Sequence, residues 1–348
     1  MHRVLLKNKG EVEAKNMKND VNVLIFGAAG FLGTNLVKKW AQERSSANIT
    51  AIDLMHPFFQ STRNGIESVI KCKNGFPKID FIKGDIRDRS LLKPLIPNAD
   101  IIYNCAAQTS HQHSFTDPIL DASINCIGNL ELLNAVKELN PYARIIYPSS
   151  STVIGKATRR ITDETDREDP RDIYSANKCV AEKHYQIFNW QYGLRTVVLR
   201  FANLYGPYGK SDPLFGFVNY FIHRAWQNKE ITIFGDGLQT RNVMFVDDAV
   251  EILWHAAWND RLIGRPYFAV HDEHWSVKDV ASEIVRQFSK GKIVCIPWPE
   301  ERKRMEIDNA VISGELLKKT VDWKPKYTLQ EGLSRTKEFF IQNEKEAR

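Results

Sequence analysis

Short apolar runs alternate with amphipathic segments along about the first 200 residues. The runs predict strands at 21–26, 48–53, 79–85, 99–107, 143–150 and 195–201. Between them, apolar residues recur at helical spacing, which predicts helices at 31–42, 89–96, 129–140 and 174–193. Strands that are apolar throughout are buried on both faces, as in a parallel sheet covered by helices on either side. The pattern therefore predicts an α/β protein with a Rossmann-type, doubly wound parallel sheet.

This alternation ends near residue 201, and residues 203–241 are rich in glycine, proline and aromatic residues. A helix at 247–258 and a strand at 266–270 are expected to return to the main sheet. A helix from Ser276, a short strand near 293–297 and a final helix from Leu329 are expected to add to a smaller, mixed C-terminal lobe. The expected division is a polar tail at 1–20, a main domain at 21–200 with 242–270, and the lobe at 201–241 with 271–345.

Composition restricts the classes of protein to consider. Hydrophobic residues make up 43% of the 348 residues, which is enough for a large core. The net charge is +6, but the 48 basic and 42 acidic residues are well mixed and form no basic stripe of the kind that binds nucleic acid. No apolar run reaches the roughly 18 residues of a membrane span, and the start lacks the apolar stretch of a signal peptide. The cytoplasm is therefore the expected location.

The cysteines are odd in number, widely spaced and without a C-x-x-C pair. They are Cys72, Cys105, Cys126, Cys179 and Cys295. This spacing argues against a disulfide framework and against a zinc site. We expect free thiols and no bound metal.

A glycine-rich turn lies between the first expected strand and its helix. Gly27, Gly30 and Gly33 form the pattern G-x-x-G-x-x-G. Glycines at this point let the chain turn tightly, let a pyrophosphate approach the backbone and let the helix pack against the strand. The phosphates would then lie at the helix N-terminus. Glycines that serve only helix packing are the alternative, but strand, glycines and helix follow one another in the order of a dinucleotide site.

Acidic residues end the second and third expected strands. Asp53 lies 20 residues after Gly33, where a carboxylate can accept both ribose hydroxyls and would repel a 2′-phosphate. This favours NAD over NADP, with a solvated loop acid as the alternative. Asp85 and Ile86 are candidates for adenine binding, although a simple Gly84–Asp85 turn would look similar.

Tyr174 and Lys178 have the spacing i, i+4 near the start of a long expected helix, so they share a face. A neighbouring ammonium stabilises a phenolate and lowers its pKa, so the pair can remove a proton from a hydroxyl while hydride leaves the same carbon. The alternative is an exposed helix with a surface lysine. Ser150, in the serine-rich end of the fifth strand, is placed to hydrogen-bond the reacting oxygen, unless that segment is only a turn.

An ordered set of motifs extends these observations. They are GAAGFLG, DIRD, NCAAQ, SSSTVIG, YSANK, RFANLYGP and GDGLQTRNVMFVDD, and the similarity runs from Val21 to about Phe340. In this order the chain resembles extended short-chain dehydrogenases/reductases, and more closely the NAD-dependent nucleotide-sugar epimerases and dehydratases of the UDP-glucose 4-epimerase type. The resemblance implies an NAD-binding Rossmann domain, a nucleotide-sugar-binding lobe and a homodimer joined by two long helices from each subunit.

The resemblance also implies a role for each matching position. Tyr174 would be the base, Lys178 would hold the nicotinamide ribose and Ser150 would be the hydroxyl partner. The expected cofactor contacts are Gly27, Gly30, Phe31, Leu32, Gly33, Asp53, Asp85, Ile86, Ala106, Ala107, Gln108, Asn125, Tyr174, Lys178 and Phe201. The expected substrate contacts are Ser151, Thr152, Asn203 and Arg241, the last two at the diphosphate. A guanidinium suits phosphate oxygens, but a surface arginine is the alternative for Arg241.

The sugar pocket departs from the family pattern. Gln108 replaces a lysine of the epimerases, Ile154 replaces a tyrosine, and the stretch TSHQHS is unusual. The 4,6-dehydratases carry an Asp-Glu pair where this chain has Ser151 and Thr152, and neither of these can act as a carboxylate acid or base. Dehydration is therefore disfavoured.

Epimerisation at C4 of a UDP-hexose is the leading interpretation. A keto-sugar reductase is the alternative, although Asp53 opposes NADPH, and a C2 or 3,5-epimerase uses the same scaffold. His111 and His113 would be ring bases in a 3,5-epimerase, but an exposed polar loop explains them as well. A cofactor-binding scaffold without turnover is disfavoured by the intact Ser150, Tyr174 and Lys178.

Overall fold

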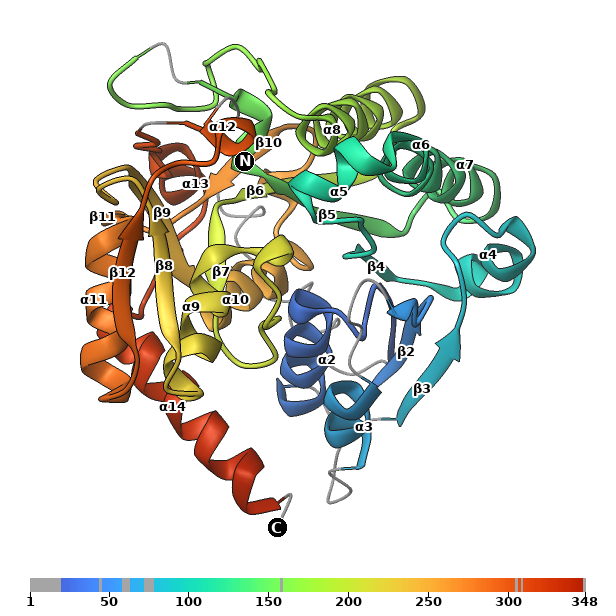
Figure 1. Cartoon of the computed structure of the whole chain (residues 1–348). Coiled ribbons are helices and arrows are strands. Elements are labelled where there is room, and N and C mark those ends of the chain that lie inside the picture. The colour runs from blue at the N-terminus through green and yellow to red at the C-terminus, as the bar shows by residue number, and fades with distance from the viewer. Residues whose placement is uncertain are drawn as a thin grey trace, which may run out of the picture.

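The computed structural model describes residues 20–43, 46–57, 63–71, 78–156, 159–303, 306–307 and 309–346. Nearly all of the expected polar tail and Cys72 lie outside the described residues. Figure 1 shows the arrangement of the chain, with the main sheet crossing the centre and a second group of strands and helices beside it.

The main sheet has seven strands, all parallel, in the order β10-β6-β5-β4-β1-β2-β3. The strands are β1 (Val21–Phe26), β2 (Ala47–Asp53), β3 (Lys78–Lys83), β4 (Ile101–Asn104), β5 (Arg144–Ser150), β6 (Arg195–Phe201) and β10 (Pro266–Ala269). This confirms the predicted Rossmann-type sheet and the return of the chain to it at β10. The strand expected at 99–107 is shorter, because the chain leaves the sheet after Asn104 to enter the site described below.

Helices cover both faces of this sheet. On one face lie α2 (Phe31–Glu43) and α10 (Val246–Ala256), and on the other lie α4 (Arg89–Leu95), α7 (Gly128–Leu139) and α8 (Ile173–Tyr192). Successive strand residues point to opposite faces. In β1, Val23 and Ile25 therefore join the core under α2, whereas Leu24 and Phe26 join the core under α7. This is the physical reason for strands that are apolar throughout.

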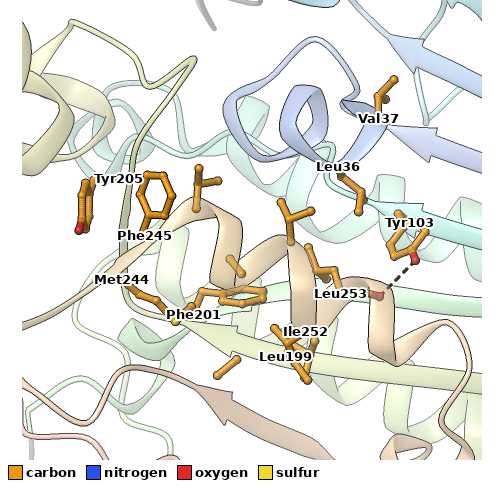
Figure 2. Packing of buried hydrophobic residues seen from close by; sticks show 14 of the residues in the cluster. Leu36, Val37, Tyr103, Leu199, Phe201, Tyr205, Met244, Phe245, Ile252 and Leu253 are labelled. Carbon is orange, nitrogen blue, oxygen red and sulfur yellow. Dashed lines mark hydrogen bonds between the residues drawn. The ribbon is translucent and has the colours of Figure 1, made fainter. Parts of the chain in front are cut away.

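The core on the α2 side continues into the second lobe. Figure 2 shows residues of α2 and α10 packed against the sheet, with the Tyr103 hydroxyl donating to the carbonyl of Leu253 at 3.1 Å. The same cluster includes Tyr205 and Phe245 from the neighbouring small sheet. The two parts of the molecule therefore share one hydrophobic core.

The second lobe contains more regular structure than its sequence indicates. Its strands are β7 (Asn203–Tyr205), β9 (Thr240–Phe245) and β11 (His274–Ser276) in one sheet, and β8 (Glu230–Phe234) and β12 (Lys292–Ile296) in another. Its helices include α9 (Phe217–Trp226), α11 (Val277–Phe288), α12 (Glu300–Lys303), α13 (Glu315–Thr320) and α14 (Leu329–Glu346). Glycines and prolines between such short elements hide their periodicity.

Further helices flank the carboxyl edge of the main sheet. They are α5 (His111–Thr116), α6 (Pro118–Ala122) and the π-helical turn η3 (Ser123–Ile127), which joins α6 to α7, whereas α3 (Arg63–Lys71) packs beside α2. None of the helices within the described residues is long and apolar enough to cross a membrane.

Candidate active site

A cavity lies at the carboxyl ends of the parallel strands. The chain runs outward from β1 through β2 and β3 and then continues on the other side with β4, so the strand order reverses between β1 and β4. Open α/β sheets bind ligands at this kind of switch point. A cavity of about 330 Å³ lies there, lined by residues that follow β1, β2, β4, β5 and β6.

The cavity brings together most of the residues singled out in the sequence. Those that line it are Gly27, Gly30, Phe31, Leu32, Gly33, Asp53, Asp85, Ile86, Ala106, Ala107, Ser150, Ser151, Thr152, Tyr174, Lys178, Phe201 and Asn203. Parallel strands that end at one edge of the sheet explain why segments far apart in sequence meet here. Gln108, Asn125 and Arg241 are not among its lining residues.

The turn after β1 leaves no room for side chains. Gly27 has a φ of +73°, and a Cβ added there would lie 2.6 Å from backbone atoms of Cys105 and Ala106. A Cβ added at Gly33 would lie 2.1 Å from the carbonyl oxygen of Gly27. The helix α2 therefore begins directly against this turn, and its positive amino end lies at the cavity, where a pyrophosphate is stabilised.

Asp53 is fixed at the end of β2 by backbone hydrogen bonds. Its side chain accepts from the amide of Ala29 at 3.0 Å and from the amide of Met55 at 2.8 Å. The residue is only 6% exposed. Because each carboxylate oxygen can accept more than one hydrogen bond, Asp53 retains the capacity to accept two ribose hydroxyls.

The residues proposed for adenine also lie at the cavity. Asp85 accepts a bidentate hydrogen bond from Arg87, at 2.9 Å from Nε to Oδ1 and 2.5 Å from Nη2 to Oδ2. Burial raises the pKa of Asp85, but the hydrogen bonds and charge of Arg87 outweigh it and lower the pKa. The carboxylate is therefore ionised and held by Arg87.

Lys210 is a cation at this cavity that the sequence analysis missed. Its Nζ lies 4.0 Å from the centre of the Phe215 ring. Burial lowers the pKa of Lys210 to about 8, although the charges of Asp53 and Asp212 act in the opposite direction. The sequence signal is weak, since a lysine in the turn GPYGK is normally exposed.

Tyr174 and Lys178 lie one turn apart in α8, and both are buried. Lys178 Nζ donates to the carbonyl of Pro148 at 2.8 Å and lies 4.2 Å from the centre of the Tyr147 ring. Burial lowers the pKa of Lys178 to about 8, with the charge of Glu182 acting against it. At neutral pH the amine therefore remains mostly an ammonium.

The Tyr174 hydroxyl is hydrogen-bonded to Ser150 at the end of β5. Burial raises the pKa of Tyr174, the carboxylates of Asp172 and Asp121 add to the rise, and the hydrogen bond with Ser150 lowers it. Ser150 Oγ lies 2.8 Å from Thr152 Oγ1. The phenol therefore keeps its proton until further positive charge is placed beside it, as a cationic nicotinamide would do.

His111 is placed beside this pair. It lines the cavity, and the centre of its ring lies 4.7 Å from that of Tyr174. Its Nδ1 donates to Asp172 Oδ2 at 2.8 Å. His113 does not line the cavity.

Gln108 and Asn125 belong to a buried polar network instead of the cavity wall. Gln108 Nε2 donates to Asp121 Oδ2 at 2.6 Å and to the carbonyl of Ser110 at 2.8 Å. Asn125 Nδ2 donates to the carbonyl of Gln108 at 2.8 Å and to Asp121 Oδ1 at 3.1 Å. These side chains hydrogen-bond the buried Asp121 carboxylate. A cofactor contact of Gln108 or Asn125 stays a prediction, since neither is among the lining residues of the cavity.

Asn203 and Arg241 lie on neighbouring strands of the small sheet. Asn203 pairs with Val243 in the β7–β9 register, and Arg241 is two residues before Val243, so the three side chains share a face. Asn203 reaches the cavity, whereas Arg241 forms an ion pair with Glu306 and donates to the carbonyl of Thr240 at 2.8 Å. The two residues expected at the diphosphate thus lie on neighbouring strands, but only Asn203 lines the cavity.

The described cysteines are free thiols. Cys105, Cys126 and Cys179 are partly buried, and Cys295 is exposed. Burial raises the pKa of Cys105 to about 12, so this cavity-lining thiol is unreactive near neutral pH. Within the described ranges, no three His, Cys, Asp or Glu side chains gather as a metal site.

The cavity fits a bound dinucleotide on two observations of the structure. The glycine turn is a cradle that a single Cβ would fill. The Oγ of Ser149, which lines the cavity and is buried, has no hydrogen-bond partner among the described residues. A buried hydroxyl without a partner at a cavity wall is typical of a ligand contact.

Comparison with known proteins agrees with this geometry. A family model described as the NAD dependent epimerase/dehydratase family matches residues 23–267. A putative UDP-glucose 4-epimerase of Methanocaldococcus jannaschii is 25% identical over 317 residues, which cover 90% of this chain and 96% of that protein. UDP-glucuronate 4-epimerase 2 of Arabidopsis thaliana is 31% identical over 241 residues, covering 67% of this chain and 54% of that protein.

A solved structure shares the fold across almost the whole length. It is the dTDP-glucose 4,6-dehydratase of Bacillus anthracis in complex with NAD, with a TM-score of 0.80 and 25% identity over 93% of this chain and 98% of that one. Because the family model covers most of the chain, the protein belongs to the NAD-dependent epimerase/dehydratase family, the extended short-chain dehydrogenase/reductase enzymes of nucleotide-sugars that use NAD.

Proposed function

We propose that this enzyme is an epimerase that inverts C4 of a UDP-hexose through a transient keto-sugar. The observation that carries the proposal is the set of acid and base groups around Tyr174. Two carboxylate residues line the cavity within the described part of the chain: Asp53, which ends β2, and Asp85, which follows β3, and we place both at the adenosine side. The positions after Ser150 hold Ser151 and Thr152, which cannot supply the acid that loss of water needs.

The residues divide the chemistry between them. The Gly27 turn would hold the pyrophosphate of NAD, Asp53 its adenosine ribose and Lys178 its nicotinamide ribose. Bound NAD would take hydride from the sugar carbon and return it. Tyr174 removes the proton of the C4 hydroxyl and later gives it back, Ser150 hydrogen-bonds the reacting oxygen, and the Lys178 ammonium favours the phenolate. Inversion requires that the keto-sugar presents its other face before the hydride returns to C4.

The names of the relatives support C4 as the carbon that is inverted and UDP as the nucleotide of the substrate. The protein of Methanocaldococcus jannaschii is named for action at C4 of UDP-glucose, and that of Arabidopsis thaliana for action at C4 of UDP-glucuronate. A keto-sugar reductase that uses NADPH is opposed by Asp53. A C2 or 3,5-epimerase would place the same residues around another carbon.

Asp53 is expected to set cofactor choice. A 2′-phosphate would lose the hydrogen bonds to this carboxylate and meet its charge, so NADP should bind at least about 2 kcal/mol, or roughly 30-fold, more weakly than NAD. Asp53→Ser should reduce this difference, since it removes the charge but keeps an acceptor. Titration of both cofactors by fluorescence measures it, with the exposed Asp80→Ser as the matched control. Equal affinity of the natural protein for NAD and NADP would contradict the assignment.

A second hollow, of about 540 Å³, is suited to the nucleotide of the substrate. It is lined by Lys156, Arg171, Asp236, Leu238, Gln239, Trp298, Lys303, Glu306, Ile307 and Asn309. Glu306 connects it to Arg241, whose strand neighbour carries Asn203 into the first cavity. We place the sugar at Tyr174, the diphosphate at Asn203 and Arg241, and the base beside the Trp298 ring, on which it can stack. Three basic residues and two acidic residues line this hollow.

An apolar stripe supports a homodimer as the working form. Val180, Ile187 and Trp190 lie on one side of α8 and are 41%, 47% and 87% exposed. The adjacent α6 and η3 add Ile119 and Ile127, at 78% and 49%. Figure 1 shows α6, α7 and α8 side by side at one edge of the molecule. Pairing of this face between two copies would bury the stripe.

Trp190→Glu is expected to convert the dimer into a monomer, because a charge at the centre of an apolar interface loses its hydration. Light scattering at micromolar concentration measures the mass. Tyr142→Glu, at a residue that is 82% exposed and outside these helices, is the control that should stay dimeric. A monomeric natural protein would refute the dimer.

A screen of nucleotide-sugars tests the reaction. UDP-glucose, UDP-galactose, UDP-glucuronate and their GDP, CDP and dTDP counterparts are incubated with the NAD-loaded protein and examined by NMR. The expected product is the C4 epimer of a UDP-hexose without net change of cofactor. A product that has lost water, or one formed only with NADPH, would replace this proposal by dehydration or by reduction.

A further inference from the structure

His111 and Asp172 form a hydrogen-bonded pair, with the histidine partly exposed, that the proposed C4 chemistry does not use. His111 begins α5, and Asp172 is the residue before α8. The Nδ1 of His111 donates to Asp172 Oδ2 at 2.8 Å, with side chains 43% and 13% exposed. Because a carboxylate only accepts, the neutral ring carries its proton on Nδ1 and presents Nε2 as a base.

The cap of α8 does not need the histidine. Asp172 Oδ1 already accepts from the amide of Ser175 at 2.7 Å, and Oδ2 accepts from the Ser175 hydroxyl at 3.0 Å. Burial would raise the pKa of Asp172, but the hydrogen bond and charge of His111, followed by the hydrogen bonds of Ser175, lower it. The carboxylate is thus ionised, which is the state that orients and supports an imidazole as a base.

The position of His111 relative to Tyr174 determines which carbons of a bound sugar the imidazole can reach. Their ring centres are 4.7 Å apart with the planes at 72°, and both residues line the cavity with Ser150 and Thr152. A sugar with its reacting oxygen at Tyr174 and Ser150 therefore has its neighbouring carbons within the part of the cavity that His111 borders. The partly exposed imidazole can also exchange its proton with water.

We propose that His111, held by Asp172, is a second acid–base catalyst that exchanges hydrogen on the carbon next to the sugar ketone. The inference rests on the proposed function, because the ketone is the intermediate of that reaction. His111 Nε2 takes the proton as the C–H bond breaks, and the C–H electron pair forms a carbon–carbon double bond. The carbonyl oxygen takes the proton that Tyr174 carries, which gives an enediol when the carbon is C3 and an enol when it is C5. The reverse steps return one proton to carbon and one to Tyr174, so no oxidant or reductant is consumed.

The two groups are suited to these opposite tasks. Burial raises the pKa of Tyr174, so its hydroxyl holds the proton that it shares with the ketone oxygen. Imidazole is the side chain best able to accept and return a proton near neutral pH. Return of the proton to the opposite face of the same carbon would invert a second centre, so the site would take nucleotide-linked 4-keto-hexoses as substrates in their own right.

Deuterium exchange into a ready-made ketone tests the proposal without the oxidation step. The NAD-loaded protein is incubated in D₂O with a UDP-linked 4-keto-6-deoxyhexose, and NMR reports carbon-bound deuterium at C3 and C5. The natural protein should introduce deuterium well above the enzyme-free rate. His111→Gln should reduce the rate by about 100-fold or more, the usual contribution of a general base. Asp172→Asn should give a partial loss, and Tyr174→Phe should lose the exchange as well.

His113→Gln, two residues along α5, is the matched control and should exchange like the natural protein. The C4 epimerisation of the natural protein, measured on a UDP-hexose, tests the proposed function independently of the exchange. Exchange no faster than in buffer, or exchange unchanged by His111→Gln, would overturn this inference. A failure of the proposed function appears separately, as absence of a C4 epimer while the ketone still exchanges.

Discussion

Tyr174→Phe is expected to reduce turnover of a nucleotide-sugar about 1000-fold, within the usual range for loss of a general acid–base group. The substitution removes one hydroxyl, which is hydrogen-bonded to Ser150, and leaves a ring that fills the same buried volume. NAD binding and secondary structure should be unchanged, because the Gly27 turn and Asp53 are untouched. Steady-state rates, NAD titration and circular dichroism measure the three properties.

Tyr192→Phe provides the matched control on the same helix. Tyr192 is the last residue of α8 and is 48% exposed, so loss of its hydroxyl should leave the rate unchanged. Activity near the natural level in Tyr174→Phe would remove this residue from the chemistry. A loss of activity accompanied by a loss of NAD binding would instead indicate a damaged cofactor site.

Arg241→Ala is expected to weaken nucleotide-sugar binding by about 2 to 3 kcal/mol, or roughly 30- to 150-fold in Kd. A guanidinium binds a diphosphate through charged, two-pronged hydrogen bonds. Removing it also leaves Glu306, its ion-pair partner, beside the bound anion. NAD affinity should not change, because the NAD pyrophosphate lies at the Gly27 turn. Isothermal titration of UDP and of NAD measures both effects.

Two further variants sharpen this result. Arg241→Lys should recover only part of the affinity, because an ammonium cannot make the two-pronged contact. Arg265 is an exposed arginine just before β10, at the amino end of that strand, whereas the cavity lies at the carboxyl ends of the strands. Arg265→Ala should therefore bind UDP normally. Normal UDP binding by Arg241→Ala, or loss of NAD binding instead, would show that the substrate lobe is misplaced.

The main sheet could be predicted from sequence because its strands are buried on both faces. Val21–Phe26 and Arg195–Phe201 read as apolar runs for that reason, and the helices between them are long enough to show their period. The second lobe could not be predicted in the same way. Its strands β7 and β11 have three residues each, which is too short for a pattern to emerge.

The parts of the site that lie close together in sequence were also predictable. Gly27, Gly30 and Gly33 form one turn, and Tyr174 and Lys178 share one helix face. The pair of His111 and Asp172 could not be found, because 61 residues separate its members and only the packing of α5 against α8 joins them. The family resemblance implies a cofactor contact for Gln108, but sequence could not show that its side chain hydrogen-bonds the buried Asp121 carboxylate.

The most direct test of the central claim follows a label at the carbon that we propose is inverted. UDP-glucose with deuterium on C4 is incubated with the NAD-loaded protein, and NMR and mass spectrometry follow the sugar. The proposed epimerase should give UDP-galactose that keeps the deuterium on C4, with the absorbance of the bound cofactor the same before and after turnover. Deuterium found in released NADH, or a product that has lost water, would contradict it.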